Sequence, residues 1–136
     1  MNQKIKNALI SVSDKEKLIS ILKILKKYKV KIISSGGTYK SIKKLGYDCT
    51  ELSKYTGFKE MLDGRVKTLH PKIHAGILHD RENKIHKNEM NIKKFPPIDL
   101  IIVNFYPFQK VVMSTSNPKE IVDNIDIGGP TMVRAA

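Results

Sequence analysis

Short apolar runs alternate with helical repeats in the N-terminal part of this chain, and this alternation limits the fold more than any other feature. Apolar runs at 7–12, 30–34 and 48–52 have the length of buried strands. The segments between them, up to residue 29 and from 39 to 45, have the spacing of helices. This order of strands and helices predicts an α/β fold, in which a parallel sheet carries helices on both faces.

The first helix has both a start signal and a regular apolar face. Ser13 and Glu16 have the spacing of a capping box, in which a hydroxyl and a carboxylate bind free amides of a new helix. Leu18, Leu22 and Leu25 then recur at steps of four and three residues. We therefore expect this helix to begin directly after Ser13.

The rest of the chain has a less regular pattern. The segment 53–71 has no clean period and is expected to be a long functional loop. Residues 98–103 form the most hydrophobic run of the chain, which predicts a central parallel strand. Further helices are expected at 73–78, from Asn117 onward and at 130–136, and a solvated helix or mobile surface segment at 81–94.

Composition narrows the function classes. The chain has 136 residues, enough for one domain, and a net charge of +12 that comes almost entirely from lysine. The lysines are spread along the sequence, which favours a solvated lysine surface over a nucleic-acid patch. No apolar run approaches the roughly 20 residues of a membrane-spanning helix. Cys49 is the only cysteine, which excludes an internal disulfide and fits a reducing compartment, so we expect a cytoplasmic protein.

Two polar segments follow the first two strands and are candidates for phosphate binding. Ligands of open parallel sheets bind outside the carboxyl ends of the strands, which here carry Ser11–Lys15, Ser34–Thr38 and Asn104–Tyr106. A helix start offers free amides and a positive dipole end, and Lys15 adds charge. Ordinary helix caps explain either segment alone. Two of them on successive strands favour a phosphate site.

Three other features have both a functional and a structural interpretation. The segment Asp63–Pro71 is dense in cations and donors, and it is either a ligand loop or a basic surface turn. His70 and His74 have the spacing of a metal pair, but no third ligand is evident, so no metal site is predicted. Asp126 precedes a glycine-led helix start and is either its cap or an acid of the site.

Several segments, taken together and in this order, are similar to one enzyme family. They are Leu9–Lys15, Ser35–Thr38, Tyr55–Phe58 with Glu60 and Met61, Gly64–Pro71, His74–Leu78, Asn104–Phe108 and Asn124–Ala136. They resemble the cyclohydrolase domain of the bifunctional AICAR transformylase/IMP cyclohydrolase family of purine biosynthesis. The resemblance covers essentially the whole chain, and the runs 64–71 and 125–131 are its most specific parts.

The resemblance implies a methylglyoxal-synthase-like (MGS-like) fold and ring closure of 5-formamido-imidazole-4-carboxamide ribotide to inosine monophosphate (IMP) and water. It implies no metal and no organic cofactor. It places the substrate phosphate against Ser13, Lys15, Ser35, Gly37 and Thr38, and further substrate contacts at Gly36, Arg65, Thr68, Asn104 and Gly128. By the same resemblance, Lys67 holds the oxyanion, Asp126 takes part in proton transfer, and Tyr106 orients or polarises the reacting groups.

The sequence also departs from the family pattern. In the family, the sequence continues after the Arg-Ala-Ala stretch with a lysine that pairs with the catalytic aspartate, whereas this sequence stops at Ala136. The expectation is that residues 1–136 are a C-terminally incomplete cyclohydrolase domain without the transformylase domain. We expect reduced or no turnover from this chain alone, and a homodimer is possible in a full-length protein.

Three alternatives stay open. The first is a non-catalytic MGS-like module, or an inactive fragment, that only binds phosphorylated metabolites. Such a module has no need of Lys67, Tyr106 and Asp126 together, so their joint presence favours the enzyme. The second is methylglyoxal synthase itself, which the segments 65–71 and 106–108 disfavour. The third, a basic nucleic-acid-binding domain, is supported by charge alone.

Overall fold

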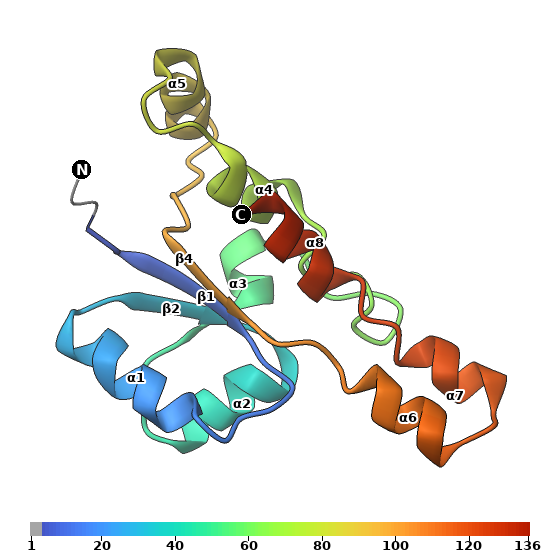
Figure 1. Cartoon of the computed structure of the whole chain (residues 1–136). Coiled ribbons are helices and arrows are strands. Elements are labelled where there is room, and N and C mark those ends of the chain that lie inside the picture. Colours follow the sequence, from blue (N-terminus) through green and yellow to red (C-terminus); the bar gives the residue numbers. More distant parts are fainter. Residues whose placement is uncertain (1–3) are drawn as a thin grey trace.

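A four-stranded parallel sheet forms the centre of the molecule (Figure 1). The computed structural model describes residues 4–136. The strands are β1 (Asn7–Ser11), β2 (Lys31–Ser34), β3 (Thr50–Glu51) and β4 (Leu100–Val103). They lie in the order β3-β2-β1-β4, and every pairing between them is parallel. The predicted α/β fold with a parallel sheet is confirmed.

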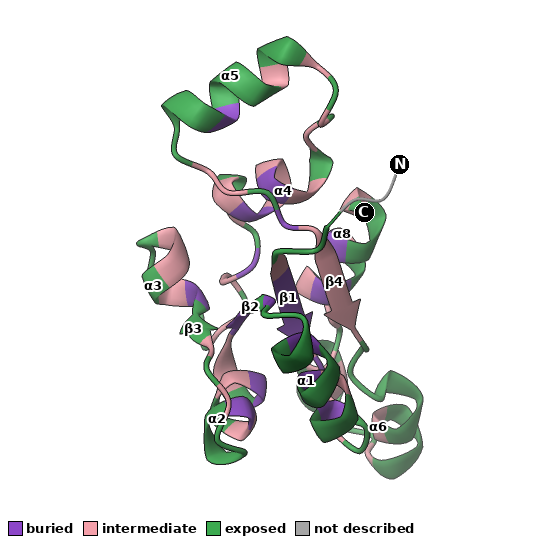
Figure 2. Ribbon diagram, turned by 90° about the vertical axis from the view of Figure 1, so that its left-hand side faces the viewer, coloured by how far each residue is buried: buried purple, intermediate pink, exposed green. Residues whose placement is uncertain are grey.

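Helices cover both faces of this sheet. The helices are α1 (Leu18–Lys27), α2 (Gly36–Lys44), α3 (Leu52–Thr56), α4 (Pro71–Leu78), α5 (Lys84–Ile92), α6 (Phe108–Ser114), α7 (Pro118–Asp123) and α8 (Gly128–Ala135). Of these, α1 and α2 cover one face, and α3, α4 and α8 cover the other. Successive residues of β1 point to opposite faces, so Ile10 packs with α1 and α2 while Leu9 packs with α3, α4 and α8. The buried residues of the sheet accordingly lie on β1 and β2, and others lie on the inner sides of α1, α2, α3, α4 and α8 (Figure 2). The prediction of helices on both faces is confirmed.

The first helix begins later than the capping box predicts. Its first residue is Leu18, and no side chain caps it. The Asp14 carboxylate instead accepts a hydrogen bond from the Glu16 amide at 2.9 Å, so the acid stabilises a turn before the helix. The prediction of a helix directly after Ser13 is therefore wrong. The consequence is useful for function, because residues 13–17 remain a loop at the carboxyl end of β1.

The most hydrophobic run lies at the edge of the sheet and not at its centre. Strand β4 pairs with β1 alone among the strands described between residues 4 and 136. Leu100 and Ile102 pack against the core on one face, and Ile101 and Val103 pack against the core on the other. The run is apolar throughout because both faces of β4 are covered. The prediction of a central strand is wrong, since a strand at the edge of a sheet can also have two covered faces.

The long loop predicted at 53–71 is shorter in the structure. Its first residues belong to α3, and Pro71 opens α4, whose N-cap is His70. Between the two helices, the chain makes a turn that is closed by a bridge between Met61 and Val66. The loop therefore spans residues 57–70. The expected helices near 73–78, 117 and 130–136 and the solvated helix within 81–94 are confirmed.

A buried carboxylate joins β1 to the segment that leads into β4. The Asp99 side chain is 5% exposed and accepts hydrogen bonds from the amides of Lys6 and Asn7 at 2.7 and 2.8 Å. Its second oxygen pairs with Arg81 at 2.5 Å. This cluster fixes the amino ends of β1 and β4, at the edge of the sheet opposite the carboxyl ends of the strands.

Within the described part of the chain, no helix is long and apolar enough to cross a membrane.

Candidate active site

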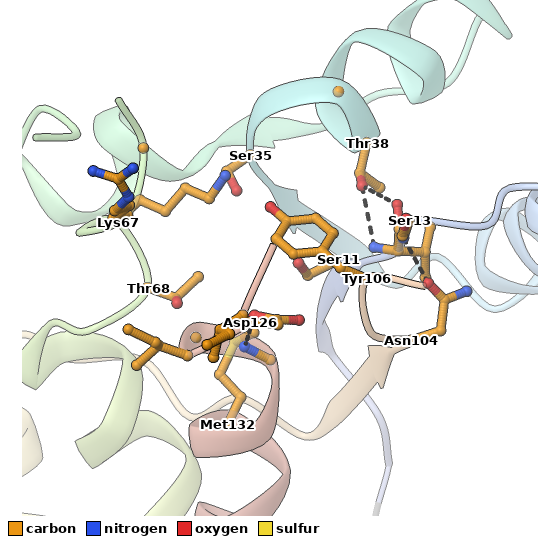
Figure 3. A pocket seen from close by; sticks show the side chains of 18 of the residues that line it. Ser11, Ser13, Ser35, Thr38, Lys67, Thr68, Asn104, Tyr106, Asp126 and Met132 are labelled. Carbon is orange, nitrogen blue, oxygen red and sulfur yellow. Dashed lines mark hydrogen bonds between the residues drawn. The ribbon is translucent and has the colours of Figure 1, made fainter. Parts of the chain in front are cut away.

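A cleft of about 850 Å³ opens where the carboxyl ends of β1, β2 and β4 meet (Figure 3). Its walls come from the loop after each of these strands, from the loop 57–70, and from α7 and the start of α8. The volume lies within the range typical of small-molecule sites. The cleft therefore has the position that an open parallel sheet favours for a ligand.

The first turn of α2 faces this cleft without a cap. Ser35 precedes the helix in an extended conformation, and its side chain accepts no hydrogen bond from the helix amides. Gly36 has a φ of +53°, a region that glycine enters more easily than other residues. Uncapped amides at the positive end of a helix bind anions, so this turn is suited to a phosphate.

Thr38 has a structural bond at this turn. Its buried hydroxyl accepts from the Val12 amide at 3.1 Å and donates to the Val12 carbonyl at 2.9 Å. Because its one hydrogen is used in this way, the hydroxyl joins α2 to the end of β1. The backbone amide of Thr38 is the donor that this residue offers to the cleft.

Asn104 fixes the loop after β1. Its Oδ1 accepts from the amides of Ser13 and Asp14, at 2.5 and 3.1 Å, and its Nδ2 donates to the Asp14 carbonyl at 2.9 Å. The Lys15 ammonium folds back onto the Ser13 carbonyl at 3.0 Å. A residue that follows β4 thus sets the conformation of the loop that follows β1, and this loop carries Lys15 at the cleft.

Lys67 reaches from the loop 57–70 toward the start of α2. A Cβ built on Gly36 would lie 3.4 Å from the Lys67 ammonium, and Figure 3 shows this side chain extending toward Ser35. Among residues 4–136, no hydrogen bond or ion pair engages the ammonium. It is therefore a cation that is available to a ligand.

Asp126 lies at the other side of the cleft, and Tyr106 lies between the two groups in the view of Figure 3. Oδ1 of Asp126 accepts from the Gly129 amide at 3.0 Å, so the expected helix-capping role is present. Within the described residues, no hydrogen bond engages its Oδ2 or the hydroxyl of Tyr106. Tyr106 as a whole is 45% exposed. One carboxylate oxygen is thus fixed and the other is open to the cleft.

Gly128 allows the loop 57–70 to approach α8. A Cβ at this position would lie 2.4 Å from the Thr68 hydroxyl, which is closer than real Cβ contacts come. Thr68 itself is buried. Only a residue without a side chain lets the two segments meet here, and their meeting closes this side of the cleft.

The comparison with protein families agrees with this architecture. The family model for the MGS-like domain matches residues 17–131, which is most of the chain. This chain belongs to the family of MGS-like domains. A crystal structure of ForH superposes with a TM-score of 0.78 at 28% identity, covering 97% of this chain and 67% of that one.

The curated relatives of this MGS-like domain are much longer proteins. It is 52% identical over 132 residues to the bifunctional purine biosynthesis protein PurH of Clostridium acetobutylicum, covering 97% of this chain and 26% of that protein. It is 48% identical to the protein of the same name from Bradyrhizobium diazoefficiens, covering 98% of this chain and 25% of that protein. The chain thus spans about a quarter of the length of these relatives. The family resemblance drawn from the sequence is confirmed.

The MGS-like domain brings nearly all of the predicted site residues together. Twelve line the cleft: Ser13, Lys15, Ser35, Gly37, Thr38, Arg65, Lys67, Thr68, Asn104, Tyr106, Asp126 and Gly128. Gly36 lies beside the cleft, where a Cβ built on it would be 3.4 Å from the Lys67 ammonium. These are placements in space, and the role of each residue stays a prediction.

Several lining residues were not predicted from the sequence. Eight of them lie in segments that the sequence analysis singled out without giving them a role of their own: Ser11, Val12, Asp63, Gly64, Ile125, Ile127, Gly129 and Met132. Val122 and Asp123 lie outside every such segment. Asp123 had no local signal, since it reaches the cleft only because α6 and α7 fold back as a hairpin (Figure 1).

Charge is unevenly arranged in the cleft. The Lys67 ammonium lies near the open first turn of α2, whereas Asp123 and Asp126 lie at the α7–α8 side, where Asp123 pairs with Arg65. An anionic group is favoured beside α2, and a proton acceptor is available at the α7–α8 side.

No group of three His, Cys, Asp or Glu side chains that could hold a metal ion occurs in residues 4–136.

Proposed function

We propose that this MGS-like domain is an IMP cyclohydrolase, which closes the ring of 5-formamido-imidazole-4-carboxamide ribotide to give IMP and water. One observation carries the proposal. Lys67, Tyr106 and Asp126 line the same cleft as the uncapped first turn of α2. The similarity to purine biosynthesis proteins supports this choice of substrate class.

The ribotide phosphate would bind at the start of α2. The amides of Gly36, Gly37 and Thr38 and the ammonium of Lys15 supply donors and positive charge there. Ser13 and Ser35 add hydroxyls at the same end of the cleft. With its phosphate there, the base of the ribotide would extend toward Tyr106 and Asp126.

The chemistry is an addition followed by loss of water. The carboxamide nitrogen forms a bond to the formyl carbon, and its proton passes to the formyl oxygen. The hydroxyl then leaves with the proton of the formamido nitrogen, and a carbon–nitrogen double bond remains. An amide nitrogen is a poor nucleophile, so the site must accept its proton and stabilise the negative charge on oxygen.

The free groups of the cleft meet these needs. The open Oδ2 of Asp126 is the proposed proton acceptor, because its partner oxygen is already held by Gly129. The Lys67 ammonium is the proposed donor to the oxyanion, since no other group engages it in the described part of the chain. Tyr106 would orient the reacting groups between them.

The compartment and partners follow from this substrate. A phosphorylated ribotide is charged and does not cross membranes freely, which supports the cytoplasm as the place of action. A small nucleotide as ligand also makes nucleic-acid and membrane partners unnecessary. A homodimer of a longer protein is supported by α6, which buries no residue and exposes Val112 and Met113.

The proposal is tested by following conversion of the formylated ribotide to IMP by the purified chain, against a buffer blank. Because turnover by this chain alone is expected to be reduced, we expect at most slow conversion above the blank, which falls to the blank rate in Lys67→Ala. The matched control is Lys54→Ala on α3, which removes the same charge outside the cleft. A chain that binds IMP without any conversion would support the non-catalytic module instead. A chain that does not bind IMP would contradict the proposal.

A further inference from the structure

We propose that Asp123 is a positioning residue, whose carboxylate holds the Arg65 guanidinium at the cleft so that it meets the bound ribotide. This inference rests on the proposed function, because it concerns the same ligand. It adds α7 to the site, through a residue for which the sequence offered no signal.

The geometry is direct. Nη2 of Arg65 donates to Oδ1 of Asp123, and both residues line the cleft. Arg65 belongs to the loop 57–70 and Asp123 is the last residue of α7, 58 positions further along the chain. The pair therefore joins two segments that are distant in sequence, and it does so at the wall of the site.

This pair contributes little to the stability of the fold. The two side chains are 51% and 39% exposed, and ion pairs in water stabilise proteins only slightly. The pair of Arg81 and Asp99 differs, because Asp99 is 5% exposed and also binds two backbone amides. The main effect of Asp123 is thus on where the Arg65 guanidinium lies.

An arginine in a binding site gains from being held in this way. Its long side chain has many rotamers, and fixing one of them before binding lowers the entropic cost of meeting the ligand. Only Nη2 is bonded to Asp123, so other N–H groups of the guanidinium remain as donors. Because Arg65 lines the cleft, these donors are available to a bound ribotide.

The test is a thermodynamic cycle on the affinity for IMP, measured by isothermal titration calorimetry at low salt. Asp123→Asn removes the charge that holds Arg65, and Arg65→Ala removes the group that is held. The matched control is Glu120→Gln, which removes the same charge from α7. Among the described residues, no hydrogen bond or ion pair engages the Glu120 side chain, so the control leaves Arg65 undisturbed.

We expect Asp123→Asn to weaken IMP binding about fivefold and Glu120→Gln to change it by less than about twofold. In the Arg65→Ala background, Asp123→Asn should have no further effect, because the residue that it positions is gone. Asp123→Glu, which keeps the carboxylate, should restore most of the affinity. An unchanged affinity in Asp123→Asn, or the same loss in both backgrounds, would overturn the inference.

A second readout needs no ligand and separates this inference from the proposed function. The NMR signal of the Arg65 side-chain N–H should shift in free Asp123→Asn and stay in place in Glu120→Gln. If the native chain does not bind IMP, the proposed function fails, and this signal still decides whether Asp123 holds Arg65. A signal that is the same in both variants would overturn the pairing.

Discussion

Asn104 and Ser13 are 91 positions apart in the chain, and the Ser13 amide donates to the Asn104 side-chain oxygen at 2.5 Å. Two more hydrogen bonds join the same side chain to Asp14. The carboxyl ends of β1 and β4 are therefore connected by a side chain as well as by the sheet. This connection shapes the loop that offers Ser13 and Lys15 to the cleft.

The first prediction concerns this connection. Asn104→Ala removes all three hydrogen bonds, so the loop 13–17 should lose its fixed conformation and IMP should bind about tenfold more weakly. Isothermal titration calorimetry measures this affinity. The control is Asn83→Ala, which removes the N-cap of α5 far from the cleft and should leave the affinity unchanged. Equal affinities in the two variants would contradict the proposed role of Asn104.

Gly128 and Gly37 should respond differently to the same substitution. Gly128→Ala places a Cβ 2.4 Å from the Thr68 hydroxyl, so we expect a loss of about 2 kcal/mol in the free energy of unfolding. Gly37→Ala has no atom within 4 Å of its new Cβ and lies in a helix, so its stability should stay equal or rise slightly. Urea denaturation of both variants measures the difference. A Gly128→Ala chain as stable as the native one would refute the close approach.

The buried carboxylate of Asp99 should be important for stability. Asp99→Ala leaves the amides of Lys6 and Asn7 without their acceptor and Arg81 without its carboxylate, which should cost about 3 kcal/mol. Urea denaturation again gives the free energy of unfolding. Asp48→Ala, at an exposed position, is the control and should change it by less than about 0.5 kcal/mol. Similar losses in both variants would mean that the cluster at Asp99 is not structural.

Cys49 should react slowly with thiol reagents at neutral pH. Burial raises the pKa of its thiol from 9.0 to about 11, although the charge of Lys43 lowers it in part. The reactive thiolate is then scarce below pH 11, and the rate of reaction with iodoacetamide should rise about tenfold per pH unit up to that value. The urea-unfolded chain should level off near pH 9. A folded-state rate that levels off at the same pH would contradict the raised pKa.

The sign of the linked stability change is also defined. Because the pKa of Cys49 is higher in the folded chain than in the unfolded one, the folded state favours the neutral thiol. The stability that this group contributes is present below pH 9.0 and is lost as the pH rises through about 11. Tyr55 has the same sign, since burial raises its pKa from 10.0 to about 12.

Local patterns in the sequence predicted much of this molecule. The alternation of strands and helices, and the polar segments after β1 and β2, follow from short-range rules of periodicity and strand ends. The cleft residues of these segments, such as Ser13 and Ser35, could therefore be predicted from the sequence. The catalytic assignments came from the family resemblance and remain predictions.

The features that the sequence did not predict depend on contacts that local patterns do not encode. A capping-box pattern at Ser13 did not start a helix, because the Asp14 side chain formed a competing turn. The edge position of β4 depends on strand order, which an apolar run does not encode. Asp123 reaches the cleft only because α6 and α7 form a hairpin. The spacing of residues along the chain does not show where the second helix of such a hairpin will lie.

The measurement that tests the central claim most directly is an NMR titration of the ¹⁵N-labelled chain with IMP. If one ribotide spans the cleft, the amides of Gly36–Thr38 and those of Ile127–Gly129 should shift together, with one dissociation constant. Inorganic phosphate should shift the first group alone. An IMP titration that moves neither group, or only amides of the lysine-rich surface, would contradict the assignment of this cleft as a ribotide site.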